Sequence, residues 1–263
     1  MDRSTGGAGV AVRIAGVLRA LALPLLLAYL YETYARIVAS QSDALAPLSK
    51  ALWALGASAL DGTLWQATGF TLMVAFSGLA LGGGLGIALG IVLGLWRAAA
   101  DAAFLSVEVF RPVPSVALIP LAMLVFGFGV RMELSIVAFA CFWPLLVLTQ
   151  AAVRQVPPQL LEVARVLGFS PARQVVKFVL PSIVPRMIVA LRLGVAIALV
   201  VAVTVEIAAN PNGLGYGLIL AQQSLQPELM IGWLLWIGVL GYAVNAGAER
   251  LRIAVARRMG VAP

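Results

Sequence analysis

The sequence predicts an all-α membrane protein with six transmembrane helices. Its residues are 62% hydrophobic and 11% charged, and the mean hydropathy is +1.02, whereas a soluble domain carries roughly 25% charged residues. Long uncharged runs recur, and several reach the roughly 20 residues with which a helix crosses a bilayer. Basic residues separate these runs, which is typical of the cytoplasmic loops of a membrane protein.

The composition argues against several classes of function. The chain has no His and one Cys, Cys141, which lies inside an apolar run. A disulfide framework, a cysteine metal site and His-based acid–base catalysis are therefore not expected. The net charge of +7 would suggest nucleic acid for a soluble protein, but here the basic residues flank apolar spans. We predict no metal site and no nucleic-acid partner.

The first 61 residues predict three segments. Residues 1–12 are Gly-rich and are expected to form a disordered cytoplasmic N-terminus. Residues 13–35 are a predicted first transmembrane helix, in which Arg19 and Glu32 can snorkel to the two interfaces. A cleaved signal peptide is the alternative, but no small-residue cleavage site stands out. Residues 36–61 are moderately polar and are placed outside, in the periplasm.

An uncharged run from Gly62 to Trp96 predicts the second span. One tilted helix fits better than two spans, because no charged turn divides the run. Glycines that recur every four residues give it one flat face: Gly82, Gly86, Gly90 and Gly94. Such a face permits close helix contact, within the chain or across a dimer. Glycines that face lipid without a role are the alternative.

The rest of the chain alternates apolar spans with polar breaks. Residues 97–108 are polar and weakly amphipathic, and a tight turn is predicted at Arg131, Met132 and Glu133. A turn cluster at 210–213 and a short helix at 214–226 precede the last span. The four remaining spans are predicted at 112–130, 134–153, 184–209 and 229–248. We take residues 62–258 as one core and residues 259–263 as a cytoplasmic tail.

The distribution of basic residues predicts that both termini are cytoplasmic. In the six-span arrangement only Arg36, Lys50 and Arg131 fall outside, and the other 15 of the 18 Lys and Arg residues fall inside. Basic residues concentrate on the cytoplasmic side of membrane proteins, so this asymmetry fixes the expected orientation.

One polar interruption stands out in the second half of the chain, at residues 162–181 (EVARVLGFSPARQVVKFVLP). An apolar stripe on one face of a helix is predicted by the i, i+3, i+4 spacing of Val163, Val166 and Leu167. Gly168 is a typical helix end. Ser170 is a suitable N-cap for a second helix, which we expect to stop before Pro181. An ordinary amphipathic cytoplasmic loop is the alternative interpretation.

The same stretch resembles the cytoplasmic loop of ABC-importer permeases. That loop has the pattern Glu-Ala-Ala, three residues, Gly, nine residues, Ile, one residue, Leu-Pro. Here it is matched by Glu162-Val163-Ala164, Gly168 and Phe178-Val179-Leu180-Pro181, with Val163 and Phe178 as departures. Other stretches are similar to permeases for nitrate, sulfonate, taurine and bicarbonate, namely residues 110–114, 126–129, 205–207 and 213–216. The resemblance covers about residues 71–258.

The resemblance implies a type I ABC-importer permease fold in a bacterial inner membrane. It implies a homodimer that works with two cytoplasmic ATPase subunits and a periplasmic solute-binding protein. The transported solute would be a small anion such as a sulfonate, nitrate or bicarbonate. The loop at about 154–183 would be the coupling loop, meeting the ATPase through Glu162, Val163, Ala164, Leu167, Gly168, Phe169 and Pro181.

The chain itself is expected to be non-catalytic and to need no cofactor. It has no Gly-x-x-x-x-Gly-Lys-Ser/Thr nucleotide loop and no visible nucleophile–base pair. ATP and Mg would therefore bind to the partner ATPase. A self-contained secondary transporter or channel is the alternative function, but it would need polar coupling groups in mid-span, of which few are present.

Two sites are candidates for the translocation pathway. Arg111, beside Pro112 and Pro114, lies at the inner end of a predicted span, either as a positive-inside anchor or as a group that attracts an anion. Glu206 follows Arg186 by a helical rise of roughly 30 Å, which puts it near the outer interface. There it would be either an interfacial residue facing water or an element of a gate.

Overall fold

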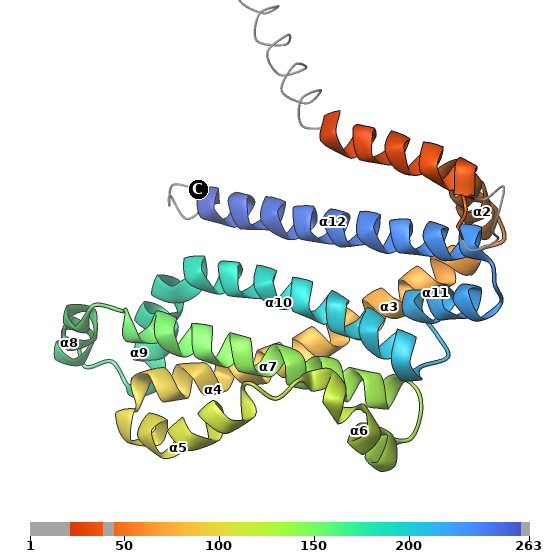
Figure 1. The fold of residues 1–263 in the computed structure, drawn as a ribbon. Helices are drawn as coiled ribbons and strands as arrows, with labels where there is room; N and C mark the ends of the chain where they lie inside the picture. The colour runs from red at the N-terminus through yellow and green to blue at the C-terminus, as the bar shows by residue number, and fades with distance from the viewer. Residues whose placement is uncertain (1–21, 39–44, 259–263) are drawn as a thin grey trace, which may run out of the picture. The chain divides into compact units, whose positions relative to one another are not determined.

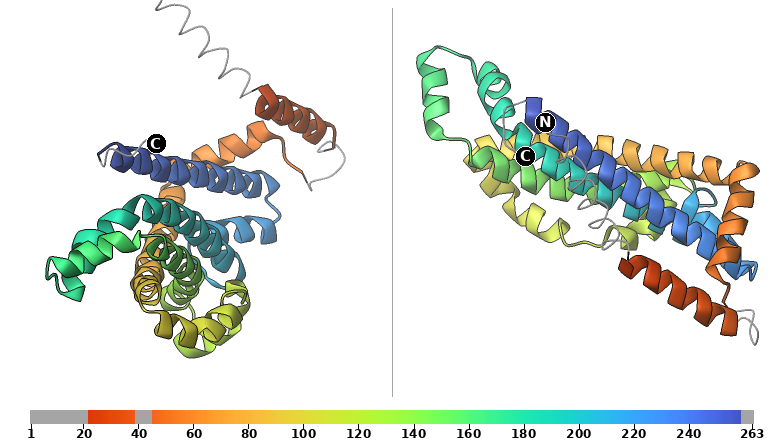
Figure 2. Two further views of the ribbon diagram at one scale, coloured as in Figure 1. Left: turned by 90° about the vertical axis from the view of Figure 1, so that its left-hand side faces the viewer. Right: turned by 90° about the horizontal axis from the view of Figure 1, so that it is seen from above.

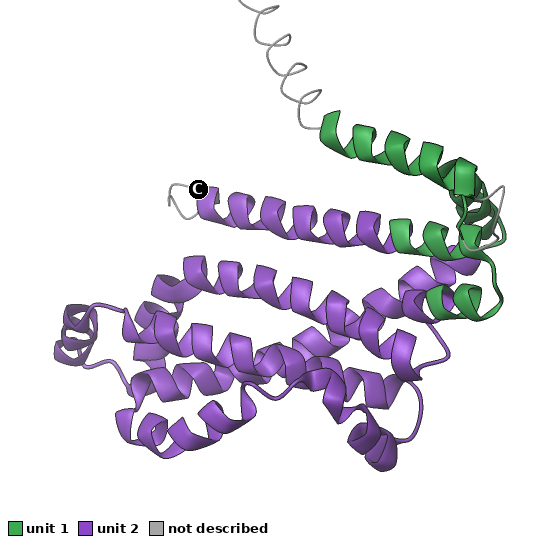
Figure 3. Cartoon of the chain, viewed as in Figure 1, with its two compact units in different colours: residues 1–62, 218–235 green, residues 63–217, 236–263 purple. Residues whose placement is uncertain are grey.

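The computed structural model describes residues 22–38 and 45–258. The predicted disordered N-terminus, the first part of the predicted first helix and the tail at 259–263 lie outside these residues. The chain divides into two compact units, residues 1–62 with 218–235 and residues 63–217 with 236–263 (Figure 3).

In the first unit, the segment predicted to lie in the periplasm contains a helix, α2 (Leu48–Leu60), preceded in sequence by a helix over residues 22–38. Tyr31 donates a 3.1 Å hydrogen bond to the carbonyl oxygen of Ala46. Glu32 accepts bonds from Arg36 at 2.7 Å and from the Ser49 hydroxyl at 2.8 Å. These contacts tie the first described helix to the start of α2.

The regular secondary structure of the second unit's described residues is all helical (Figure 1). Its elements up to the fourth predicted span are α3 (Thr63–Gly78), the π-helix η1 (Leu79–Gly83), α4 (Gly84–Leu95), α5 (Arg97–Phe110), the 3-10 helix η2 (Ser115–Leu118), α6 (Ile119–Phe126) and α7 (Val130–Arg154). Those that follow are α8 (Pro158–Val166), α9 (Pro171–Gln174), the π-helix η3 (Val175–Val179) and α10 (Leu180–Ala209). Helices α11 (Leu214–Gln223) and α12 (Pro227–Arg258) each continue across the boundary between the units.

Four helical segments among the described residues are long and apolar enough to cross a membrane, and a bent pair of helices makes a possible fifth. The segment Thr63–Leu95 is continuous, as predicted, and the π-helix η1 lies inside it. The span predicted at 112–130 is wrong in its bounds, because the helical segment there covers only Ser115–Phe126. This short segment meets α5 at 84°. Pro112 and Pro114 lie in the break, where they lack amide donors and disfavour helix in the preceding residue.

Two further predictions of element ends are wrong. The turn between α6 and α7 is made by Gly127 and Gly129, at φ 72° and 110°, so Glu133 belongs to the first turn of α7. The second loop helix does not stop before Pro181 but runs through η3 into α10. Pro181 lies in the first turn of α10, where a missing amide costs little.

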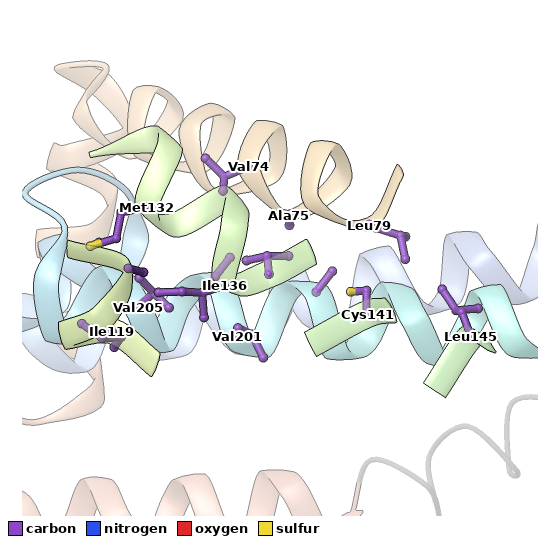
Figure 4. Packing of buried hydrophobic residues seen from close by; sticks show 14 of the residues in the cluster. Val74, Ala75, Leu79, Ile119, Met132, Ile136, Cys141, Leu145, Val201 and Val205 are labelled. Carbon is purple, nitrogen blue, oxygen red and sulfur yellow. The ribbon is translucent and has the colours of Figure 1, made fainter. Parts of the chain in front are cut away.

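The core of the second unit lies between α3, α7 and α10 (Figure 4). Its buried members include Val74 on α3, Ile136, Cys141 and Leu145 on α7, and Val205 on α10. Helix α7 is central to the unit and packs against α3, α4, α6 and α10 (Figure 2). Half of its most apolar stretch is buried within the chain, so α7 is the helix shared by these contacts.

The glycine face of α4 and η1 lies directly against α7. A Cβ on Gly82 would collide with the Ala138 backbone, and one on Gly86 with the Phe142 carbonyl oxygen. A Cβ on Gly90 would lie 2.6 Å from the Leu146 carbonyl oxygen, and one on Gly94 would lie 2.5 Å from Val153 Cβ. Close approach of two backbones therefore accounts for all four glycines within a single chain.

Candidate functional site

The loop between α7 and α10 turns at Gly168, where φ is +71°. The Phe169 amide donates to the Ala164 carbonyl oxygen at 3.0 Å, and the Gly168 amide donates to the Arg165 carbonyl oxygen at 2.9 Å. These two bonds form a Schellman motif, which ends a helix by a residue in left-handed conformation. Gly adopts that conformation at no steric cost, so the sequence sets both the end of α8 and the direction of the chain beyond it.

Contacts around Phe169 hold the residues after the bend. Its ring packs edge-on against Phe178 at a centroid distance of 5.5 Å, and Lys177 Nζ lies 5.0 Å from the ring centre. Gln174 Nε2 donates to the Phe169 carbonyl oxygen at 2.8 Å. Ser170 precedes α9 as its N-cap, but its side chain makes no capping bond. Phe169 therefore connects the bend to α9 and η3.

One side of α8 presents apolar side chains to the surroundings. Val163, Val166 and Leu167 are 52%, 88% and 62% exposed, whereas Ala164 is fully buried. Glu162, Gly168 and Pro181 are also exposed. An exposed apolar patch of this kind is a typical protein-contact surface.

The base of the loop is anchored in a separate apolar cluster. Val179, Ile183 and Met187, from η3 and α10, are buried against Ala152, Val153 and Val156 at the end of α7. The loop is thus continuous with two of the core helices.

The residues proposed for the pathway belong to separate sets of contacts. Arg111 caps α5 and forms a 3.8 Å ion pair with Glu108, in which both side chains are about half exposed. Pro112 and Pro114 lie in the break that follows. Glu206 is instead bonded to α3 and to the start of α11. The structure does not bring Arg111 and Glu206 together.

Glu206 is buried, with 1% of its surface exposed, so it is not an interfacial residue facing water. Its Oε1 accepts a 2.6 Å bond from the Thr71 hydroxyl, and its Oε2 accepts a 2.8 Å bond from the Gly215 amide. The Leu214 amide donates to Thr71 Oγ1 at 3.0 Å. Glu206 therefore fastens α3, α10 and the beginning of α11 to one another.

Glu133 is a second buried acid beside this group, and the sequence interpretation missed it. Its side chain is fully buried, and it accepts a hydrogen bond from Asn210 Nδ2. Its carboxyl group also interacts with that of Glu206. The sequence does contain a signal for Glu133, because it is an acid that directly precedes an apolar span, but the turn prediction accounted for it. Nothing in the sequence around Thr71 or Asn210 indicates a buried polar site.

Comparison with known proteins identifies relatives of this chain. Residues 85–261 match the family described as the binding-protein-dependent transport system inner membrane component. A putative ABC transporter permease of Methanocaldococcus jannaschii is 30% identical over 71% of this chain and 70% of its own length. The putative aliphatic sulfonates transport permease SsuC of Bacillus subtilis is 31% identical over 69% of this chain and 66% of its own length. The taurine transport system permease TauC of Escherichia coli is 27% identical over 73% of this chain and 70% of its own length.

Solved structures share the fold. An amino acid ABC transporter chain aligns with a TM-score of 0.62 and 17% identity, over 78% of this chain and 97% of its own length. A chain of the MetNI methionine ABC transporter in an inward-facing conformation aligns with a TM-score of 0.59 and 20% identity. The alignment covers 74% of this chain and 95% of the MetNI chain. With the family match over most of the core, the chain belongs to the binding-protein-dependent transport system inner membrane components, the multi-pass, non-catalytic permeases of ABC importers.

Proposed function

We propose that this permease forms the translocation pathway of an ATP-driven importer for a small organic or inorganic anion, delivered by a periplasmic binding protein. A sulfonate is the substrate class best supported, because two similar proteins are a sulfonate permease and a taurine permease. Nitrate and bicarbonate remain members of the same proposed class. Family membership argues against a self-contained secondary transporter or channel.

In this proposal the loop of α8 to η3 is the coupling element. Val163, Val166 and Leu167 would enter a groove of the cytoplasmic ATPase, and Glu162 would lie beside them on α8. Ala164, Gly168 and Phe169 would fix the bend, and Pro181 would join the loop to α10. The exposed apolar surface of α8 is the single observation that carries this assignment, since such a surface is stabilised by a partner that covers it.

The remaining parts of the proposal follow from the charge pattern and from the family. Two copies of the chain would form a homodimer, and this homodimer would bind two ATPase subunits. ATP and Mg would bind to the ATPase subunits. Both termini would be cytoplasmic, with six spans that include the helix over residues 13–35. Arg111, Pro112 and Pro114 would line the inner end of the pathway, and Glu206 would belong to its outer gate.

Reconstitution tests this function directly. The permease, its ATPase and its binding protein would be placed in liposomes, and uptake of labelled taurine or an alkanesulfonate would be followed with and without ATP. We expect uptake that requires ATP and the loaded binding protein, together with stimulated ATP hydrolysis. Uptake driven by an ion gradient in the absence of the ATPase would contradict the proposal, and uptake of nitrate but not sulfonates would change the substrate class.

A further inference from the structure

Two buried carboxyl groups hold the loop from Asn210 to Gly215, one at each of its ends. Glu133 on α7 and Glu206 on α10 are 0% and 1% exposed, and their carboxyl groups interact. Glu133 Oε1 has no hydrogen-bond donor among the described residues. A buried polar atom without a partner is costly, so Glu133 Oε1 is expected to gain a hydrogen-bond partner in the native protein.

The groups around the pair are neutral. Thr71 is its partner on α3, and α3 contains no charged residue. Asn210 and the Gly215 amide supply neutral donors, and Tyr216 is the one titratable residue of α11. Helix α6 contains no titratable residue. Arg131, the basic residue nearest in sequence to Glu133, is exposed. No positive charge from these elements neutralises the two acids.

The packing around Glu206 is tight. A Cβ on Gly213 would lie 2.7 Å from Glu206 Oε2, and one on Gly215 would lie 2.8 Å from Glu206 Cβ. The loop from Asn210 to Gly215 is thus pressed against the acid. Both oxygens of Glu206 already accept hydrogen bonds. These contacts favour a proton over a hydrated cation, because a proton needs no additional volume.

We propose that Glu133 and Glu206 form a proton-binding site in which the pair holds one shared proton. The protonated carboxyl group donates its O–H to the carboxylate of the other, which satisfies Glu133 Oε1 and leaves one negative charge for the pair. Two carboxyl groups can hydrogen-bond to each other only when one of them is protonated. Two like charges that interact away from water disfavour full ionisation.

The shared proton joins α7 to α10 and, through Glu206, to α3 and the start of α11. Removal of the proton leaves two adjacent negative charges, and their repulsion separates α7 from α10 at this end of the bundle. The site is therefore a pH-dependent contact between α7 and α10, which is lost as pH rises. The protonation of Glu133 and Glu206 does not depend on whether the transported solute is a sulfonate.

Infrared spectroscopy of the purified permease–ATPase complex tests the site without any transport assay. A protonated carboxyl group gives a C=O stretching band that shifts in D₂O, and we expect one such buried group per permease chain near neutral pH. The variants Glu133→Gln and Glu206→Gln should each lose the band, because the glutamine amide donates to the remaining carboxylate. Glu108→Gln, which replaces a half-exposed acid, is the control and should keep it.

Each alternative outcome contradicts the proposal in a different way. Absence of the band in the wild-type complex would mean that both acids are ionised. A band lost in only one of the two variants would mean that one acid is protonated by itself. As a second measurement, the melting temperature should fall at alkaline pH in the wild type and stay level in Glu133→Gln. A melting temperature that instead rises with Na⁺ at constant pH would identify a cation as the occupant.

Discussion

The amide of Phe169 donates a 3.0 Å hydrogen bond to the carbonyl oxygen of Ala164, and this bond closes helix α8. Ala164 is fully buried on the inner side of the helix, whereas Val163 and Val166 beside it are exposed. The bond therefore lies beside the exposed apolar residues of α8. It also places the Phe169 ring against Phe178, so the exposed surface and the base of the loop are held by one local arrangement.

Gly168→Val is expected to disturb this arrangement. No atom lies within 4 Å of a Cβ built on Gly168, so the cost comes from its φ of +71° alone. A β-branched residue in left-handed conformation costs about 1–2 kcal/mol. Insertion into the membrane should be unchanged, while stimulation of ATP hydrolysis by the loaded binding protein should be weakened in liposomes.

Gly168→Asn is the matched control, because Asn tolerates the left-handed conformation better than other non-Gly residues. We expect Gly168→Asn to retain most of the stimulated ATP hydrolysis. Arg173→Ala removes an exposed charge of α9, so its effect on stimulated ATP hydrolysis should be small. Full stimulated turnover and uptake in Gly168→Val would show that this loop does not couple the two subunits.

Gly86→Ala and Gly84→Ala separate helix packing from helix propensity. A Cβ on Gly86 would meet the Phe142 carbonyl oxygen and lie 3.1 Å from the Leu146 amide, whereas nothing lies within 4 Å of a Cβ on Gly84. Overpacking of this kind costs about 1–3 kcal/mol. The melting temperature of the purified protein should fall for Gly86→Ala and stay level or rise for Gly84→Ala.

A larger change at the same helix extends the test to assembly. Gly86→Leu should reduce complex formation and transport more than Leu85→Ala, because Leu85 is 58% exposed within the chain. Equal and mild effects of these two substitutions would mean that the contact between α4 and α7 is dispensable.

The orientation of the chain can be measured by labelling of single cysteines. Arg173 and Lys50 are both exposed, and the proposed topology places them on opposite sides of the membrane. In a Cys141→Ser background, a cysteine at 173 should react from the cytoplasm alone and one at 50 from outside alone. Cys141 is fully buried, so the wild-type protein should label weakly and serves as the background control. The reverse pattern would exclude the proposed orientation.

A polar contact between α10 and α12 gives a fourth prediction. Arg192 Nη1 lies 2.5 Å from Glu249 Oε2, and Arg192 Nε donates to Asn245 Oδ1 at 3.1 Å. The Arg192 side chain is 39% exposed, so solvent screening reduces its contribution to about 0.2–1 kcal/mol. A double-mutant cycle of Arg192→Gln and Glu249→Gln, measured by denaturant unfolding, should give a coupling energy in that range. Strict additivity would mean that the pair contributes nothing.

Several features could be predicted from the sequence because they depend on local rules. Apolar run length identified Thr63–Leu95 as one continuous helical segment. The residues 162–168 predicted a helix that ends at Gly168, since a glycine at that position allows the backbone to reverse. The same residues, by their spacing, indicated the permease family that the comparison establishes.

The tertiary structure alone decided which distant residues meet. Glu133 and Glu206 are 73 positions apart in the chain, and nothing local to either one indicates the other. Thr71 and Asn210 become significant only because α3 and the α10–α11 turn meet at the same place. The bend at Pro112 and Pro114 and the passage of the helix through Pro181 were likewise outside local rules. Helix periodicity determines which face is apolar, but packing between helices determines which polar groups are enclosed and must find partners there.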